Sequence, residues 1–209
     1  MEPAHNRLAF QFIGGNPALD LINTVDWTSL GPREERLGNF RRLSDWAKDA
    51  GLVPPKHATR LRRIAETRPQ DAESTYRRAV RTREVLGRLF RSVATGNPDS
   101  EALREFNHRL GQALEQMKIV GVKPARDAGN RFELGWKEGE ARLDSLLWPV
   151  LWSAASLLTS AEVSRIRICD GPDCGWMYVD RSRNGFRRWC QMETCGTREK
   201  SRRRKRVSR

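Results

Sequence analysis

The 209-residue sequence has no run of eighteen apolar residues, which is about the length that a helix needs to cross a bilayer. It also has no internal repeat, and no leader segment is recognisable at its start. We therefore expect a cytoplasmic protein with no membrane partner. With 38% hydrophobic and 31% charged residues, the chain can still bury a substantial core.

Catalytic signatures are missing as well. The sequence contains neither the His-Glu-x-x-His motif of zinc proteases nor the Gly-x-Ser-x-Gly turn of serine hydrolases. The three histidines, His5, His57 and His108, are isolated from one another. Acidic residues are scattered among arginines, which is typical of surface ion pairs. We therefore predict that the protein is not an enzyme.

Cysteine is scarce, and all four cysteines lie near the C-terminus. Cys169 pairs with Cys174, and Cys190 with Cys195, each pair with four intervening residues. This spacing is typical of a tetrahedral site in which four thiolates hold one Zn²⁺ and leave no coordination position open. Two disulfides or an iron-sulfur cluster are the alternatives. Because thiols stay reduced in the cytoplasm, we favour one structural zinc ion.

Acidic residues are also rare at the C-terminal end. Residues 181–209 contain twelve Lys or Arg and two Glu, a net charge of +10 out of +13 for the chain. Such a surface attracts nucleic acid because each neutralised phosphate releases a condensed counterion. A solubilising tail, a nuclear-import signal or a membrane-surface patch would have a similar composition. The predicted nucleic-acid contacts are Arg181, Arg183, Asn184, Arg187, Arg188, Trp189, Arg198, Lys200, Arg202, Arg203, Arg204, Lys205 and Arg206.

A family resemblance lies in residues 181–200, which read Arg-Ser-Arg-Asn-Gly-Phe-Arg-Arg-Trp-Cys-Gln-Met-Glu-Thr-Cys-Gly-Thr-Arg-Glu-Lys. This stretch resembles the CGNR zinc finger, a C-terminal module of bacterial proteins described as candidate stress-induced transcription regulators. The resemblance extends over about 165–205. One residue departs from it, because Thr197 stands where the family has Asn. Both residue types can cap a helix by accepting a bond from a backbone amide, so we expect the fold to survive.

A second resemblance lies in residues 12–25, Phe-Ile-Gly-Gly-Asn-Pro-Ala-Leu-Asp-Leu-Ile-Asn-Thr-Val. They are similar to the start of the ABATE domain, which commonly precedes the CGNR finger. Asp20, Asn23 and Thr24 match its Leu-Asp-x-x-Asn-Thr pattern and are candidates for a ligand pocket. We favour the alternative that they bond neighbouring backbone. The domain would respond to a small-molecule effector or a protein partner.

Periodic patterns predict mostly helical structure before residue 160. A strand over 8–13 should lead into a helix capped by Asn16, with later helices starting near residues 40, 61, 72 and 98. We expect a hairpin over 119–136, and then a helix over 142–159 kinked at Pro149. Beyond it we expect strands over 165–169 and 176–180 and a basic helix from about residue 194.

These patterns indicate an α+β, mostly helical fold with two domains. Residues 1–160 would form a helical ABATE-like domain with a few short strands, and residues 161–209 a treble-clef or ribbon-like zinc finger. We expect residues 1–160 to stay folded without metal. We predict a zinc-finger transcription regulator that binds nucleic acid, with duplex DNA as first choice. RNA binding and docking of an acidic protein remain alternatives, since DNA and RNA share the phosphate attraction.

Overall fold

The computed structural model describes residues 9–28, 31–122, 131–137, 142–171 and 173–207. In these residues helices dominate, and none is long and apolar enough to cross a membrane. The α-helices are α1 (Pro17–Ile22), α2 (Phe40–Asp49), α3 (Pro55–Thr67), α4 (Pro69–Thr95), α5 (Ser100–Leu114), α6 (Trp148–Leu158) and α7 (Thr197–Val207). Antiparallel pairs join β1 (Val25–Thr28) with β2 (Gly31–Glu35), β3 (Met117–Val122) with β4 (Arg131–Trp136), and β5 (Ile166–Ile168) with β6 (Met177–Val179). The expected α+β, mostly helical class is therefore confirmed.

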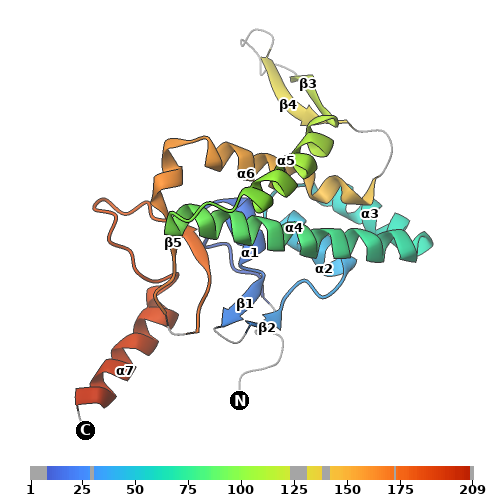
Figure 1. Ribbon diagram of the computed structural model, residues 1–209. Coiled ribbons are helices and arrows are strands. Elements are labelled where there is room, and N and C mark those ends of the chain that lie inside the picture. Colours follow the sequence, from blue (N-terminus) through green and yellow to red (C-terminus); the bar gives the residue numbers. More distant parts are fainter. Residues whose placement is uncertain (1–8, 29–30, 123–130, 138–141, 172, 208–209) are drawn as a thin grey trace.

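The core forms where α1 meets α4 and α6. Leu19 and Leu21 of α1, Leu86 and Phe90 of α4 and Val150 of α6 are fully buried there. The helices α2 and α3 pack together on one side of α4, whereas α5 packs against both α4 and α6. Figure 1 shows that α7 and the β3–β4 hairpin project from this body in different directions.

Helix boundaries follow local signals where the chain supplies them. The Asn16 side chain accepts a 2.8 Å bond from the Ala18 amide, with Pro17 in the first turn, as predicted. Gly96 ends α4 with φ 73°, a left-handed conformation that favours glycine. The helix predicted to start near residue 98 is α5, which begins at Ser100. Its side-chain acceptor is Asp99, which takes a 2.8 Å bond from the Ala102 amide.

The segment around Pro149 also differs from the prediction. A single kinked helix over 142–159 is replaced by a 3-10 turn, η1 (Leu143–Leu146), followed by α6. Pro149 lies in the first turn of α6, where its missing amide hydrogen has no intrahelical partner to lose. The proline therefore starts a helix and does not bend one.

Two predictions about strands had different outcomes. The β3–β4 hairpin is confirmed, although its connecting residues 123–130 lie outside those described. The strand expected over 8–13 does not form in the described residues 9–13. Directly after this segment, the Val179 amide of β6 donates a hydrogen bond to the Gly14 carbonyl at 2.9 Å. The β1–β2 pair was not predicted from the sequence.

The buried core continues past residue 160. Ile166 on β5 and Met177 and Val179 on β6 belong to the same apolar cluster as the side chains of α1, α4 and α6. In addition, α4 packs against β5 and α1 packs against β6. Because the two parts share one core, we expect loss of the finger to lower the stability of residues 1–160 as well. A domain boundary at 160 stays a prediction from sequence.

Candidate metal centre and nucleic-acid interface

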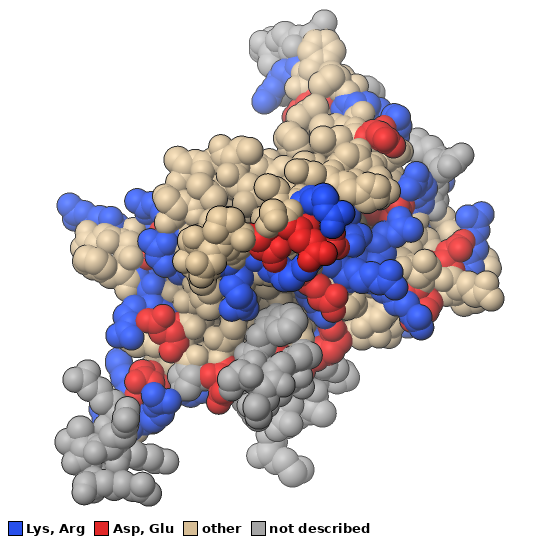
Figure 2. All heavy atoms as spheres, viewed as in Figure 1, with Lys and Arg blue, Asp and Glu red and all other residues tan. Residues whose placement is uncertain are grey.

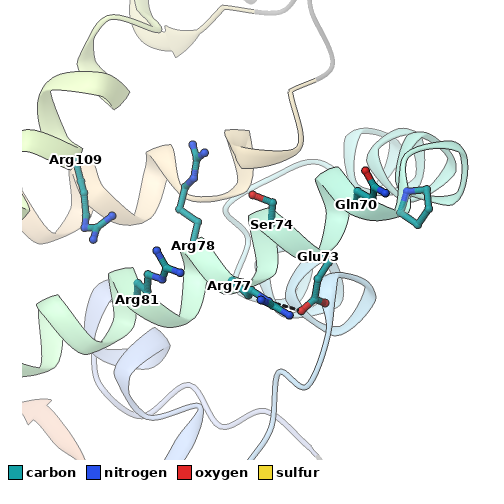
Figure 3. Close-up of a pocket in the computed structure, with 8 residues that line it drawn as sticks. Gln70, Glu73, Ser74, Arg77, Arg78, Arg81 and Arg109 are labelled. Carbon is teal, nitrogen blue, oxygen red and sulfur yellow. Dashed lines mark hydrogen bonds and ion pairs between the residues drawn. The ribbon is translucent and has the colours of Figure 1, made fainter.

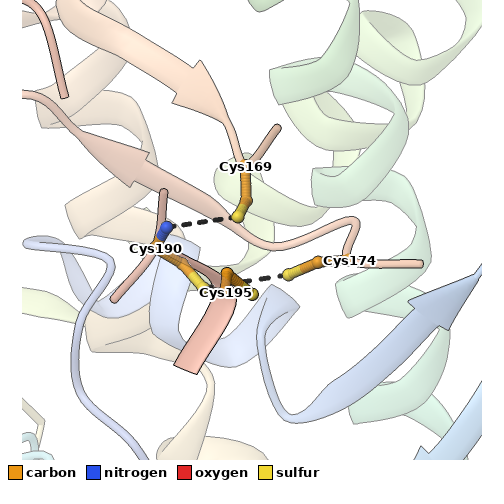
Figure 4. Close-up of side chains that lie close together, drawn as sticks. All are labelled: Cys169, Cys174, Cys190 and Cys195. Carbon is orange, nitrogen blue, oxygen red and sulfur yellow. Dashed lines mark hydrogen bonds between the residues drawn. The ribbon is translucent and has the colours of Figure 1, made fainter. Parts of the chain in front are cut away.

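The four cysteines come together from separate positions around the β5–β6 pair. Cys169 directly follows β5, and Cys174 precedes β6, so the two lie in the knuckle that joins these strands. Cys190 lies in the long loop after β6, and Cys195 lies in η3 (Met192–Gly196), a π turn that leads into α7. Figure 4 shows the four side chains converging on one point. A strand pair whose knuckle holds the first ligand pair, followed by a loop and a π turn that hold the second, agrees with the treble-clef or ribbon-like module expected from sequence.

The sulfur positions fit one zinc ion. All four Sγ atoms lie within 4.8 Å of one another, with 3.8 Å between Cys174 and Cys190 and 3.5 Å between Cys190 and Cys195. Four thiolates about 2.3 Å from a tetrahedral zinc would be roughly 3.8 Å apart. The same separations are too long for a disulfide, and all four cysteines are free. The prediction of one structural Zn²⁺ is thus confirmed. Four thiolates fill a tetrahedral site, so no coordination position would stay open for a substrate.

The backbone around the cysteines is shaped to carry thiolate charge. The amides of Gly171 and Cys190 both point at Cys169 Sγ, at 3.3 Å and 3.2 Å. Bonds from the Cys174 and Cys190 thiols, and then these amides, lower the pKa of Cys169. Gly171 has no space for a side chain, since a Cβ there would lie 2.9 Å from Cys195 Sγ. The knuckle therefore presents bare backbone to the metal ligands.

Arg187 holds the metal loop in place. Its guanidinium carbon lies 4.0 Å from the centre of the Tyr178 ring, and its Nε donates to the Trp189 carbonyl at 3.1 Å. It also donates through Nη2 to the carbonyl of Cys190 at 2.5 Å, next to the metal. Tyr178, which is fully buried, donates its hydroxyl to the Arg187 carbonyl at 2.7 Å. These contacts give Arg187 a structural role that the nucleic-acid prediction had missed.

Asp180 organises the loop that follows β6. This carboxylate is fully buried, and it accepts bonds from the Ser182 amide at 2.9 Å, the Ser182 hydroxyl at 2.6 Å and the Arg187 amide at 3.0 Å. Burial raises the pKa of Asp180, but the bonds from Ser182 and Arg187 outweigh it and leave the pKa below its ordinary value. The two ends of loop 181–187 are thereby fixed to one anion. Sequence reasoning missed Asp180, because a lone Asp after a strand carries no distinctive signal.

Several of the predicted contacts already pair with acids. Arg181 makes a two-pronged bond to Glu162, at 2.6 Å and 2.9 Å, and Arg188 bonds Asp170 at 2.8 Å. On α7, Arg202 lies 3.5 Å from Glu199. Each of these arginines remains more than half exposed, so its pair is a weak, solvent-screened one that a phosphate can replace.

Three other predicted contacts have no acidic partner among the residues that the structure describes. In the described part of the chain, Arg183, Arg198 and Lys200 are exposed and pair with no carboxylate. Asn184 and Phe186 are exposed beside Arg183. We call this set of five residues the finger surface. Arg204 is exposed on α7, and Trp189 is half-buried against the cysteine cluster. The side chains of Arg203, Lys205 and Arg206 lie outside those described.

Thr197 acts differently from the predicted cap. It is the first residue of α7, and its hydroxyl donates to the Met192 carbonyl at 3.1 Å instead of accepting from an amide. This bond satisfies a carbonyl in the π turn that carries Cys195. An Asn side chain also has a donor, so the expectation that the fold tolerates either residue keeps a physical basis.

The candidate pocket residues of α1 and its C-terminal end are buried, and each bonds protein groups. Asp20 accepts from the Gly14 amide at 2.7 Å, and the Thr24 hydroxyl donates to the Leu21 carbonyl at 2.6 Å. Asn23 exchanges two bonds with the backbone of Met177, at 2.8 Å and 2.9 Å. The contacts agree with the favoured alternative, backbone bonding, and a ligand pocket here stays a prediction. For Asn23 the bonded backbone is not a neighbour, but a strand of the finger 154 residues away.

Asn23 is part of a polar joint between the helical part and the finger. The Trp176 indole beside the knuckle donates to the Val25 carbonyl at 3.1 Å, and the Arg36 guanidinium lies 5.5 Å from its ring centre. Sequence could not reveal these contacts, which connect residues about 150 positions apart. They fix the orientation of the metal site on the helical body.

A second arginine-rich surface lies on the outer side of α4 and α5. A groove of about 710 Å³ is lined there by Arg77, Arg78, Arg81 and Arg109, with Glu73, Ser74, Gln70 and Pro69 (Figure 3). We call Arg77, Arg78, Arg81, Arg88 and Arg109 the α4–α5 face. In Figure 2 basic and acidic side chains are interspersed over it. Arg77 pairs with Glu73 at 2.7 Å, and Arg78 with Asp144 at 3.1 Å. This is the solvated ion-pair surface that the scattered acids predicted.

Comparison with known proteins agrees with this architecture. A sequence model of ABATE, described as "Putative stress-induced transcription regulator", matches residues 15–161, and one of the CGNR zinc finger matches residues 165–206. No curated protein matches the chain. Both matched families are regulatory or metal-binding, not enzymatic. The chain therefore belongs to the ABATE family and carries a CGNR zinc finger in residues 165–206.

Proposed function

We propose that this protein is a transcription regulator that binds duplex DNA through the finger surface and α7. The observation that carries this proposal is a group of exposed cations, Arg183, Arg198 and Lys200, that have no acidic partner among the described residues and lie on a frame that one zinc ion would fix. Because the metal would fix the backbone that carries these cations, that backbone does not have to become ordered when phosphates bind. The favourable free energy then comes mainly from release of counterions condensed on the DNA.

The zinc ion supplies rigidity in this function and no chemistry. Cys169, Cys174, Cys190 and Cys195 would hold it, and a site closed by four thiolates has no position for a substrate. The π turn that contains Cys195 runs directly into α7. The metal therefore determines where the basic helix begins and in which direction it leaves the body.

The helical part is suited to control the finger. Its contacts with β6 run through α1, where Asn23 bonds Met177 and where Gly14, bonded to Asp20, accepts from Val179. A ligand or protein partner that shifts α1 would move the metal site. A tenfold change in DNA affinity requires about 1.4 kcal/mol of differential binding.

A competition experiment tests the polymer. The zinc-loaded chain is bound to labelled duplex DNA at physiological salt, and unlabelled duplex DNA, double-stranded RNA and single-stranded RNA are added as competitors. We expect duplex DNA to compete best, with a log-log salt slope near −4 to −5 if about five phosphates are contacted. Stronger competition by either RNA would identify an RNA-binding protein. Affinity that does not change with salt would indicate apolar contacts in place of the proposed phosphate contacts.

A further inference from the structure

The loop between β6 and η3 displays an aromatic ring to solvent. Phe186 is 81% exposed, the highest value among the described large hydrophobic side chains. In the described part of the chain it has no aromatic or cationic ring contact. Since burying a Phe side chain is favourable by about 1.5 to 3 kcal/mol, a ring left this open is available to a partner.

The buried carboxylate of Asp180 fixes the loop that carries Phe186. Asp180 bonds both its start, at Ser182, and its end, at Arg187. Between them Gly185 takes φ 68°, and its amide donates to the Ser182 carbonyl at 3.3 Å, which closes a tight turn directly before the ring. The backbone and the buried carboxylate therefore set the position of Phe186 in advance. A ring positioned in advance loses little conformational entropy when it binds.

The surroundings of Phe186 identify the kind of partner. Arg183 and Asn184 are exposed three and two residues earlier, and Arg188 is exposed two residues later. In Figure 1 this loop lies on the same side of the body as α7. The partner must therefore combine negative charge with flat apolar faces. Nucleic acid has both, because every base has a π face next to a phosphate. An acidic protein surface would supply the charge without a stack of flat faces.

We propose that Phe186 places its ring against a base of duplex DNA and partly unstacks one base step, while Arg183 contacts a neighbouring phosphate. This inference rests on the proposed DNA binding and adds a base contact to it. Proteins that kink DNA insert apolar side chains between base steps in the same manner, most easily at flexible pyrimidine–purine steps. Contact through Phe186 would make the finger surface prefer DNA sequences whose base steps unstack easily.

The test uses the zinc-loaded full chain and duplexes with 2-aminopurine at successive positions around TA and CA steps. The fluorescence of this base rises when it unstacks. We expect wild-type protein to raise it at one step, and Phe186→Ala to abolish the rise and weaken binding roughly 5- to 100-fold. The salt slope should not change, because no charge is removed. Phe186→Trp should retain both the affinity and the signal.

Phe132→Ala is the matched control, since Phe132 is 68% exposed on β4 of the projecting hairpin. It should bind DNA like wild type. The proposal is overturned if wild type binds DNA while Phe186→Ala binds equally well, or if Phe186→Trp fails as completely as Phe186→Ala with its zinc retained. If wild type binds no duplex DNA at all, the proposed function itself fails, which is a distinguishable result.

Discussion

Most arginines of the α4–α5 face pair with carboxylates, whereas the cations of the finger surface have no carboxylate partner among the described residues. On the α4–α5 face, Arg88 pairs with Glu101 and Glu105, and Arg109 lies 3.6 Å from Glu105. Of the arginines that line the groove, Arg81 alone lacks an acid among the described residues. On the finger surface none of the three cations has one among the described residues. Local arginine density alone therefore does not identify a nucleic-acid surface, because neighbouring carboxylates can neutralise it.

The same two regions also differ in what stabilises them. Apolar side chains of α1, α4 and α6 stabilise the helical part, whereas beyond β6 the chain depends on the metal, Asp180 and Arg187. Since surface ion pairs contribute little to the stability of the finger, its exposed cations are not needed for folding and are available for a partner. Predictions that separate the two regions follow in order of expected effect.

Removal of zinc should have the largest effect. We expect Cys174→Ser with Cys190→Ser, or chelation of the wild type, to abolish zinc binding and weaken DNA binding by at least about 100-fold. Because β5 and β6 share the helical core, the melting temperature of the whole chain should also fall. Metal analysis, calorimetry and fluorescence anisotropy measure the three effects. Restoring Zn²⁺ to the chelated protein is the control, and an unchanged melting temperature would restore the idea of an independent finger.

Arg187→Lys should be the next most damaging change. A lysine cannot stack on Tyr178 and bond both the Trp189 and Cys190 carbonyls, so we expect a loss of roughly 2 kcal/mol in unfolding free energy. Zinc should also leave the variant faster when a chelator is added. Arg188→Lys, on an exposed and solvent-screened ion pair, is the control and should change stability much less. Equal effects of the two substitutions would mean that Arg187 is only a surface cation.

Asp20→Asn should have a smaller, pH-dependent effect. Burial raises the pKa of Asp20 to about 6, although the amides of Gly14 and Ile13 oppose this shift. A raised carboxyl pKa stabilises the fold fully only below the unfolded value of 3.8, and this contribution is lost as pH rises through 6. Because an amide does not ionise, the Asp20→Asn variant would not suffer that loss. The stability of the variant relative to wild type should therefore rise by roughly 1 kcal/mol between pH 5 and pH 8.

Denaturant unfolding of zinc-loaded wild type and variant at both pH values measures this difference. Comparing the two proteins at each pH cancels the titration of the cysteines, which both contain. A stability difference that stays constant from pH 5 to pH 8 would show that Asp20 is ionised throughout, with an ordinary pKa.

Features encoded by neighbouring residues could be predicted from the sequence. The four-cysteine site, the Asn16 cap and the stop of α4 at Gly96 each depend on a few adjacent positions. Family resemblance added the order of the two parts. It could not distinguish cations that are free from those already paired.

Features that depend on the folded environment were missed. Asn23 was expected to bond neighbouring backbone, whereas its partner, the Met177 backbone, lies 154 residues away. Arg187 looked like a phosphate contact because its stacking on Tyr178 appears only in three dimensions. Pro149 was expected to kink a helix because the 3-10 turn before it has no clear sequence signal. In each case the contact that fixes the role of the residue is a tertiary one, which the local sequence does not encode.

The difference between the two arginine-rich surfaces can be tested most directly with two matched triple variants. One carries Arg183→Gln, Arg198→Gln and Lys200→Gln on the finger surface, and the other Arg77→Gln, Arg81→Gln and Arg88→Gln on the α4–α5 face. Each removes three positive charges, so the overall charge of the two proteins is equal. The measurement is the affinity for duplex DNA as a function of salt. We expect the finger variant to reduce the slope by about 2 to 3 and the α4–α5 variant to leave it near the wild-type value; equal losses in both would contradict the assignment of the finger surface as the DNA contact.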